Sequence, residues 1–243
     1  MSQTTQPAIF RRADIYHDFY QGRGKNYEGE AKLALELIRE QAPAAESLLD
    51  VACGSGAHLR ELSRSFGRTV GVDLSHGMLE IAARIAPGAP LHQGDMRGFR
   101  LDERFDAVIC MFSSIGFVTT VAELEQVVRN LADHTNPGGV VLVEPWWFPD
   151  NFIPGYVGAD IVKVDGRSIA RMSHTVRAGA NSQMEEHFMV ATAEAGVEHF
   201  SDTHVMSLFD REAYEAAFLK AGLDVEYVKH EVSGPGVFVG KKR

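Results

Sequence analysis

Two glycines separated by one residue follow an acidic residue in the stretch LLDVACGSGAHL, Leu48 to Leu59. The apolar run that ends at Asp50 is typical of a buried parallel strand, and Gly54-Ser55-Gly56 predicts a tight turn that leads into a helix. Turns of this kind let a ligand approach the backbone closely, and they commonly bind nucleotides. The first question that the sequence raises is therefore which nucleotide this turn binds.

The residues after the turn narrow the answer. A dinucleotide-binding fingerprint has a third glycine three residues after the second, and here that position is Leu59. Asp73 ends a second predicted strand, where an acidic side chain accepts hydrogen bonds from ribose hydroxyls in several cofactor classes. Three further features distinguish between these classes: Gly94-Asp95-Met96 after a third strand, Met111 in a fourth, and the stretch NPGGVVLVE over 136–144.

Alternating strands and helices would position these residues. The pattern predicts a doubly wound, mainly parallel α/β sheet of the seven-stranded type, with ligands at the carboxyl ends of its strands. A helix-loop-helix precedes the first strand, with a break at Gln21–Tyr27, and short alternating segments between Trp146 and Phe209 predict an antiparallel β insertion. The expected division is a helical lid over 1–44, a sheet domain over 45–145 and 210–243, and a β-rich insertion over 146–209.

Composition and charge limit the partners and the compartment. The 243-residue chain carries a formal net charge of -9, so no basic surface predicts binding to nucleic acid or to an anionic membrane. Cys53 and Cys110 both lie in apolar runs, which favours a reducing compartment over structural disulfides. The first residues lack the apolar core of a signal peptide. We therefore expect a cytoplasmic protein.

The glycine turn, Asp73, Gly94-Asp95-Met96 and NPGGVVLVE together resemble class I S-adenosylmethionine-dependent methyltransferases over the predicted sheet domain. The absence of a third glycine agrees with this resemblance, because S-adenosylmethionine carries no pyrophosphate. A nicotinamide-dependent oxidoreductase is the weaker alternative, and a binding module without catalytic activity is another. The resemblance implies that S-adenosylmethionine is the cofactor and that these residues bind it: Tyr16, Tyr27, Ala52, Gly54, Gly56, Asp73, Leu74, Asp95, Met96 and Met111.

Four further stretches narrow the resemblance: FYQGRGKNY, LHQGDMR, MFSSIG and above all EPWWFP at Glu144–Pro149. They are similar to the TDP-amino-sugar N,N-dimethyltransferases that make sugars such as desosamine and mycaminose for antibiotics. The resemblance implies that the chain methylates the amino group of a TDP-linked amino-deoxyhexose once and then again. The resemblance is also compatible with a homodimeric enzyme. The alternative is a methyltransferase for another small amine or hydroxyl group.

The chain departs from the pattern of these relatives at two places. Phe117 stands where the family has Tyr or His after the SSIG stretch, and Ser233-Gly234-Pro235-Gly236 replaces a stretch that contains an arginine. The second departure removes one cationic side chain that would contact a phosphate or a sugar. It leaves open whether the acceptor amine is at C3 or at C4 of the hexose.

Aromatic and basic residues predict where such a substrate binds. Trp146 and Trp147 leave the fifth strand at the ligand edge and offer flat apolar surfaces for a sugar face or a thymine base. Arg171 and Arg177 are separated by an even number of residues in a strand-like segment, so both point to one face and are able to meet a diphosphate. The structural alternative for the tryptophans is core packing, and the structural alternative for the arginines is a solvated sheet edge.

A neutral sugar amine needs little help from a base, because neighbouring oxygens lower its basicity. Tyr20 and Glu144 are the candidates for orienting the amine or accepting its proton. The histidines of the insertion lack the spacing of metal ligands, so we expect no metal site.

Overall fold

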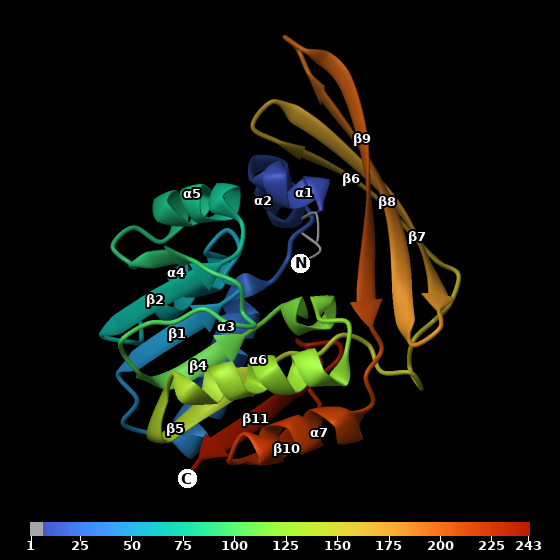
Figure 1. The fold of residues 1–243 in the computed structure, drawn as a ribbon. Helices are drawn as coiled ribbons and strands as arrows, with labels where there is room; N and C mark the ends of the chain where they lie inside the picture. The colour runs from blue at the N-terminus through green and yellow to red at the C-terminus, as the bar shows by residue number, and fades with distance from the viewer. Residues whose placement is uncertain (1–6) are drawn as a thin grey trace.

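The computed structural model describes residues 7–243, and its larger layer is a seven-stranded sheet in the order β10-β11-β5-β4-β1-β2-β3 (Figure 1). Strands β1 to β5 run parallel, whereas β11 is antiparallel to both β5 and β10. The strand order reverses between β1 and β4, which is where ligands bind in doubly wound sheets. The strands are β1 (Ser47–Val51), β2 (Arg68–Asp73), β3 (Leu91–Gln93), β4 (Phe105–Cys110), β5 (Thr135–Val143), β10 (Leu223–Val228) and β11 (Val237–Lys242).

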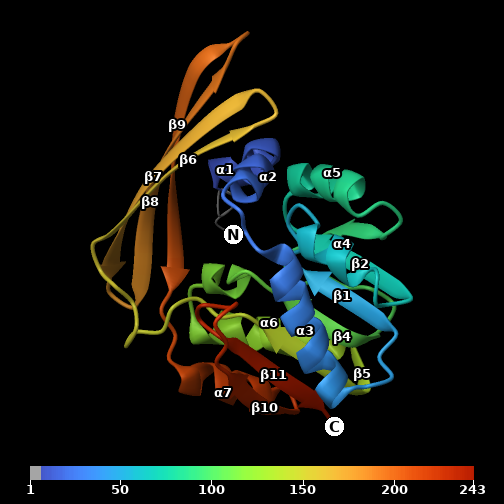
Figure 2. The ribbon, with the colours of Figure 1, turned by 180° about the vertical axis from the view of Figure 1, so that it is seen from behind.

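Helices cover both faces of this sheet. One core lies against α6 and α7, and a second core lies against α3, α4 and α5 (Figure 2). Strands buried on both faces explain the continuous apolar runs in the sequence. The helices are α1 (Ala8–Arg11), α2 (Ala13–Gly22), α3 (Tyr27–Gln41), α4 (Ala57–Leu62), α5 (His76–Ile85), α6 (Val121–Asp133) and α7 (Arg211–Lys220), with the 3₁₀ turn η1 (Ser114–Phe117).

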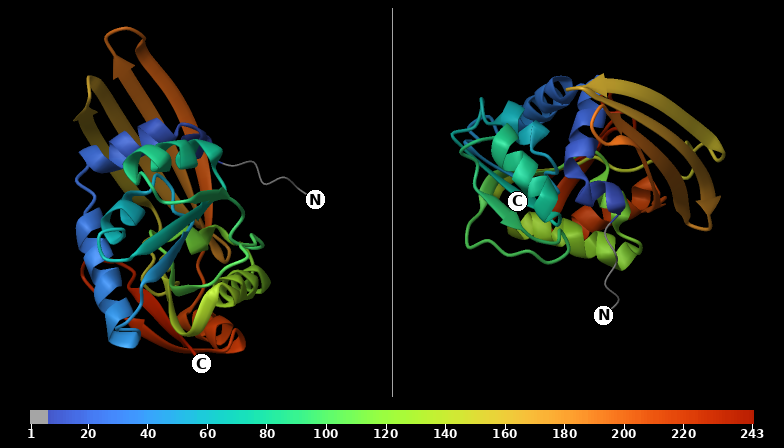
Figure 3. Two further views of the ribbon diagram at one scale, coloured as in Figure 1. Left: turned by 90° about the vertical axis from the view of Figure 1, so that its left-hand side faces the viewer. Right: turned by 90° about the horizontal axis from the view of Figure 1, so that it is seen from above.

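The insertion forms a separate four-stranded antiparallel sheet in the order β6-β7-β8-β9. Its first hairpin turns at Asp165-Gly166, where both residues have positive φ (48° and 78°), as a two-residue type I′ turn requires. Helices α1 and α2 lie between this sheet and α5 (Figure 3). The strands are β6 (Tyr156–Val164), β7 (Arg167–Ala178), β8 (Asn181–Thr192) and β9 (Gly196–Ser207).

The register of the insertion sheet decides which side chains share a face. Arg171 lies opposite Asp160 and Phe188, and Glu186 lies opposite Ser173 and Asp202. These residues belong to the face that points toward α1 and α2, which we call the inner face. Most large apolar side chains of the other face are exposed: Val157, Ile161, Met172, Val176, Met189, Val197 and Val205.

These observations confirm the predicted fold class, a doubly wound and mainly parallel sheet with preceding helices and an antiparallel insertion. The predicted break between the first helices is also confirmed, because α2 ends at Gly22 and α3 begins at Tyr27. Ser75 caps α5, since its hydroxyl accepts the amide of Met78 at 3.3 Å. Over residues 7–243, no helix combines the length and the apolar character needed to cross a bilayer.

Candidate active site

A cavity of about 1420 Å³ lies between the carboxyl ends of the parallel strands, helices α1 and α2, and the inner face of the insertion sheet. Pockets for one drug-sized ligand measure roughly 300–1,000 Å³. The cavity therefore has room for two ligands of that size. One end is lined by the glycine turn after β1, and the other by strands β6 to β9.

The glycine turn supplies backbone at the cavity wall. Gly54 has φ of +54° and no atom within 4 Å of the place where a Cβ would stand, so it leaves space for a ligand. Gly56 has φ of +78°, and an added Cβ would lie 2.9 Å from the Cβ of Ala82 on α5. Gly54 and Ala52 line the cavity, whereas Gly56 does not. Gly56 instead allows close packing of α5 against the turn.

Asp73 ends β2 at the cavity wall. One carboxylate oxygen accepts the amide of Gly54 at 2.8 Å, and the other accepts the amide of Ser75 at 2.7 Å. Burial raises the pKa of Asp73 although these amides oppose the shift. Since a carboxylate has about four acceptor positions, Asp73 is still able to accept hydrogen bonds from two ribose hydroxyls.

Asp50 is a buried carboxyl group that lines the same end of the cavity. Its Oδ2 atom has no hydrogen-bond partner among the residues that the structure describes. Burial raises its pKa to about 7, with His58 opposing and Asp73 adding to the shift. An orphaned buried carboxyl group favours a cationic ligand, and S-adenosylmethionine carries both a sulfonium and an ammonium group. The residues at this end therefore fit that cofactor.

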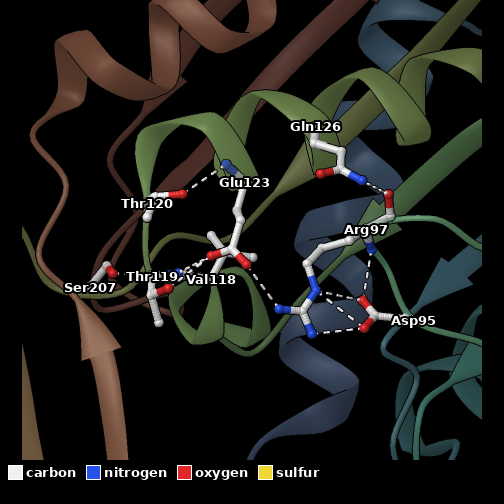
Figure 4. Close-up of polar contacts among 8 residues, drawn as sticks. All are labelled: Asp95, Arg97, Val118, Thr119, Thr120, Glu123, Gln126 and Ser207. Atoms are coloured by element: carbon white, nitrogen blue, oxygen red, sulfur yellow. Dashed lines mark hydrogen bonds and ion pairs between the residues drawn. The ribbon is translucent and has the colours of Figure 1, made fainter. Parts of the chain in front are cut away.

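The loop after β3 is held by a polar network (Figure 4). Arg97 donates from Nε to both oxygens of Asp95 at 2.9 and 3.1 Å, and it also pairs with Glu123 on α6 at 3.1 Å. Burial opposes ionisation of Asp95, but the bonds from Arg97 outweigh it and hold the pKa of Asp95 below its usual range. Asp95 and Met96 both line the cavity. Their loop is thus fixed before any ligand binds.

The remaining predicted cofactor residues also line the cavity: Tyr16, Tyr27, Leu74 and Met111. Tyr16 contacts Tyr20 ring to ring at 4.7 Å between centroids, and Met111 is buried. Their roles in cofactor binding stay predictions.

The two candidates for orienting the amine differ in position. Tyr20 lines the cavity, and burial raises its pKa, so its phenol remains neutral near pH 7. Glu144 is buried outside the cavity lining, where it accepts the amide of Phe112 at 2.7 Å and the hydroxyl of Ser233 at 3.1 Å. The structure therefore places Tyr20 where it is able to meet a substrate, and places Glu144 where it supports a loop.

The loop that Glu144 supports, after β4, has unusual backbone geometry. Phe112 and Ser113 both have positive φ, 53° and 59°, which is uncommon for residues other than glycine and tends to occur at functional sites. Both residues line the cavity. Glu144 holds the first of them and the backbone of Pro145 accepts the hydroxyl of the second at 2.7 Å. Sequence reasoning missed this strained turn, because neither residue type signals it.

Trp146 and Trp147 both line the cavity and are half-buried. The indole of Trp146 donates to the hydroxyl of Ser182 at 2.9 Å, and its Cβ would lie 2.9 Å from a Cβ added to Gly116. Trp146 is therefore fixed between η1 and the insertion. Trp147 lies beside Gly234 of the C-terminal loop, with 3.3 Å between its ring and an added Cβ.

The two arginines of β7 share the inner face, but only Arg171 lines the cavity. Arg171 is buried and donates from Nε to Glu186 at 2.5 Å. Arg177 is exposed near the end of the strand and donates to the backbone of Gly179. The even spacing of the two arginines therefore correctly predicts that they share one face of the sheet, but the cavity does not extend as far as Arg177. Arg23 lines it instead, and Arg23 and Arg171 share Asp160 at 3.0 and 3.8 Å.

Lys25 and His204 also line the cavity, although neither is among the predicted site residues. Lys25 pairs with Glu30 and stands 4.0 Å from the ring centroid of Phe112. His204 on β9 lines the cavity from the inner face. The strand-like pattern around His204 does not show whether its face of the sheet is covered.

Comparison with known proteins agrees with this geometry. A family model described as a methyltransferase domain matches residues 48–139. A dTDP-3-amino-3,4,6-trideoxy-alpha-D-glucopyranose N,N-dimethyltransferase from Streptomyces venezuelae is 54% identical over 94% of this chain and 96% of its own length. A dTDP-3-amino-3,6-dideoxy-alpha-D-glucopyranose N,N-dimethyltransferase from Streptomyces fradiae is 50% identical over 94% and 89%. A dTDP-4-amino-2,3,4,6-tetradeoxy-D-glucose N,N-dimethyltransferase from Saccharopolyspora spinosa is 42% identical over 94% and 91%.

Solved structures give the same result. The crystal structure of DesVI from Streptomyces venezuelae matches with a TM-score of 0.91 and 52% identity, over 96% of this chain and 98% of that one. CalS10, an amino pentose methyltransferase from Micromonospora echinaspora solved with bound S-adenosylmethionine, matches with a TM-score of 0.86 and 44% identity, over 94% and 97%. Since identity this high extends over nearly the whole chain, the protein belongs to the family of S-adenosylmethionine-dependent amino-sugar N,N-dimethyltransferases.

Proposed function

We propose that this enzyme transfers two methyl groups in succession from S-adenosylmethionine to the amino group of a TDP-linked 3-amino-deoxyhexose. The observation that carries the proposal is the single cavity that runs from Asp73 to the inner face of the insertion sheet. One end offers an acceptor for ribose and an orphaned carboxyl group for a cation, and the other offers aromatic and basic side chains. A methyl donor and a nucleotide sugar would therefore meet inside one cavity.

The two ends of the cavity suggest how the ligands lie. We propose that the cofactor lies along the glycine turn with its ribose at Asp73 and its adenine beside Asp95. The nucleotide sugar lies against Trp147 and the insertion, with its diphosphate near Arg171 and Arg23. Planar guanidinium groups suit phosphate oxygens because they donate two parallel hydrogen bonds.

Methyl transfer to an amine is an in-line displacement that requires a neutral nitrogen lone pair. Holding the nitrogen and the methyl carbon at a separation of roughly 3–3.5 Å supplies much of the acceleration in reactions of this type. Tyr20, the strained turn at Phe112 and the helices above them would hold the amine and exclude water. We propose that residues 1–44 act as this lid and that residues 146–209 bind the substrate.

The order of similarity supports a proposal for the position of the amine. The two relatives that act on 3-amino sugars are 54% and 50% identical to this chain, whereas the relative that acts on a 4-amino sugar is 42% identical. We therefore propose an amine at C3 and a role in antibiotic sugar biosynthesis.

A substrate panel tests the proposal. With TDP-linked 3-amino and 4-amino hexoses and S-adenosylmethionine, we expect faster methylation of the 3-amino sugars. Mass spectrometry over time is expected to show a monomethyl product that rises and then falls as the dimethyl product forms. A product that stops at one methyl group contradicts double transfer, and methylation of only simple amines or hydroxyl groups contradicts the nucleotide-sugar substrate.

Asp50 provides a prediction about pH. Its pKa of about 7 in the free enzyme means that the carboxyl group is mostly protonated at pH 6. Because this pKa is raised above the unfolded value, the contribution of Asp50 to folding stability is present below pH about 4 and is lost as the pH rises through about 7. A cationic ligand favours the ionised form, so binding of S-adenosylmethionine at pH 6 should release about one proton. Calorimetry in two buffers of different ionisation enthalpy measures this release.

The variant Asp50→Asn is expected to bind S-adenosylmethionine without that proton release. Equal proton release by the wild type and this variant would show that another group titrates. The comparison at a single pH keeps the ionisation of the ligand itself the same in both measurements.

We also propose that the enzyme works in the cytoplasm.

We propose further that it forms a homodimer through the outer face of the insertion sheet, which is the face opposite the inner face. Seven large apolar side chains, Val157 and Ile161 among them, are exposed on this one face, which is typical of a protein interface. Sedimentation of the 26.7 kDa chain as a monomer at micromolar concentration would contradict the dimer.

A further inference from the structure

His204 lies in a buried group of charged residues on the inner face of the insertion sheet. Its side chain is 7% exposed and lines the cavity. Its Nε2 atom stands 3.4 Å from a carboxylate oxygen of Glu186 and 3.8 Å from one of Asp202. This nitrogen forms no hydrogen bond to any residue in the range 7–243, so it is a buried polar atom aimed at two carboxylates.

The position of His204 follows from the strand register. Glu186 and Asp202 are directly opposite each other on β8 and β9, and His204 is two residues beyond Asp202 on the same face. Apolar rings cover the imidazole, since Phe10 from α1 and Phe117 from η1 each lie 5.6 Å from it between ring centroids. The imidazole therefore lies between the carboxylates of the insertion sheet and the rings of Phe10 and Phe117, and it borders the cavity.

His204 lies beside charged groups that carry a net negative charge. Two guanidinium groups face three carboxylates, so these five groups carry one net negative charge. The charged and titratable groups that face this region are Asp202 on β9, Glu186 on β8, Arg171 on β7, Asp160 on β6, and Arg23, Tyr16 and Tyr20 from the N-terminal helices.

The carboxylates also select the tautomer. A proton on Nε2 is attracted by Glu186 and Asp202, which leaves the lone pair of a neutral imidazole on Nδ1. Carboxylate–imidazole pairs of this kind serve as general bases, and their hydrogen bonds often tighten only when the substrate binds. Among the described residues that line the cavity, His58 is the other imidazole, but its Nε2 is already paired with Glu30 at 2.9 Å on the cofactor side.

We propose that His204 is a catalytic residue that accepts the proton of the substrate ammonium group, with Glu186 and Asp202 as positioning residues. The inference rests on the proposed function. The ammonium proton passes to Nδ1 of His204, and the freed nitrogen lone pair forms the new bond to the methyl carbon. The carbon–sulfur bond breaks, and its electron pair stays on sulfur. The product nitrogen is then a secondary ammonium group. Once the imidazolium has released its proton to water and a new molecule of S-adenosylmethionine has replaced the spent one, the same sequence adds the second methyl group.

Kinetics over a range of pH test this role. The variants are His204→Gln and a control, His92→Gln, which changes an exposed histidine on the edge strand β3 of the seven-stranded sheet, outside the cavity lining. Values of kcat/KM for a TDP-3-amino sugar are measured between pH 6 and 9, and affinity for S-adenosylmethionine is measured by calorimetry. We expect His204→Gln to be slower by about 100-fold at pH 6.5 and the difference to shrink toward pH 9, because the ammonium group then loses its proton to solvent.

The control and the cofactor affinity should stay within about twofold of the wild type, which is the size of an ordinary surface change. A His204→Gln variant that is slower by the same factor at every pH, or not slower at all, overturns the proton-transfer role. If the glutamine variant does not fold, His204→Asn is measured in the same way, since it keeps a polar group at the site. A wild-type enzyme that methylates no TDP-amino sugar would instead contradict the proposed function, so the two failures are distinguishable.

Discussion

Replacing Arg171 by alanine is expected to lower the free energy of unfolding by about 3–5 kcal/mol. Glu186 is 3% exposed, and Arg171 supplies its two guanidinium contacts. Removal of one partner leaves an uncompensated charge in a region of low dielectric constant, and this costs more than the lost ion pair. Chemical denaturation measures the change, and the melting temperature should fall by about 6–20 °C for a chain of this size.

Arg177→Ala is the matched control, because Arg177 is on the same strand and the same face but exposed. Its effect should be within about 0.5 kcal/mol. The double variant Arg171→Met with Glu186→Gln is expected to recover much of the lost stability, since no buried charge is left unpaired. Equal small effects of Arg171→Ala and Arg177→Ala would show that Arg171 is not needed to neutralise Glu186.

Asp73→Ala is expected to weaken binding of S-adenosylmethionine by about 1.5–3 kcal/mol, or roughly 10- to 150-fold. The carboxylate is the predicted acceptor for the ribose hydroxyls, and it also orders the glycine turn through the amide of Gly54. Calorimetry with the folded variant measures the loss.

Asp106→Ala controls for a general effect on the fold. Asp106 accepts two backbone amides, those of Glu46 and Ser47, at 3.0 Å each, but it lies at the opposite end of the sheet and outside the cavity. The Asp106→Ala substitution should lower the free energy of unfolding without changing the affinity for S-adenosylmethionine. Unchanged affinity in a folded Asp73→Ala variant would remove Asp73 from the cofactor site.

Local patterns in the sequence were sufficient to predict the sheet domain. Continuous apolar runs predict strands that are buried on both faces, and residues such as Ser75 and Gly22 mark where helices begin and end. The carboxyl ends of parallel strands meet at one edge, so the sequence predicts that the glycine turn, Asp73 and Asp95 lie at one site. All three stretches line the cavity.

The insertion shows what a sequence pattern leaves open. Alternation correctly predicts that Arg171 and Arg177 share a face. It does not predict where another layer covers that face, because this depends on how α1 and α2 pack against the sheet. Arg171 is therefore at the cavity and already paired, whereas Arg177 lies beyond it.

Tertiary structure alone decided the environment of the buried ionisable groups. Glu144 is a sequence candidate for accepting a proton because it follows β5 at the ligand edge, but the amide of Phe112 and the hydroxyl of Ser233 occupy both of its oxygens. The role proposed for His204 depends on Glu186 from a neighbouring strand and on rings from two distant segments, and the residues next to His204 in the sequence do not predict these neighbours. Spacing along the chain determines which face a side chain occupies, but its charge state and its access to a substrate depend on residues that only the packing of separate layers brings together.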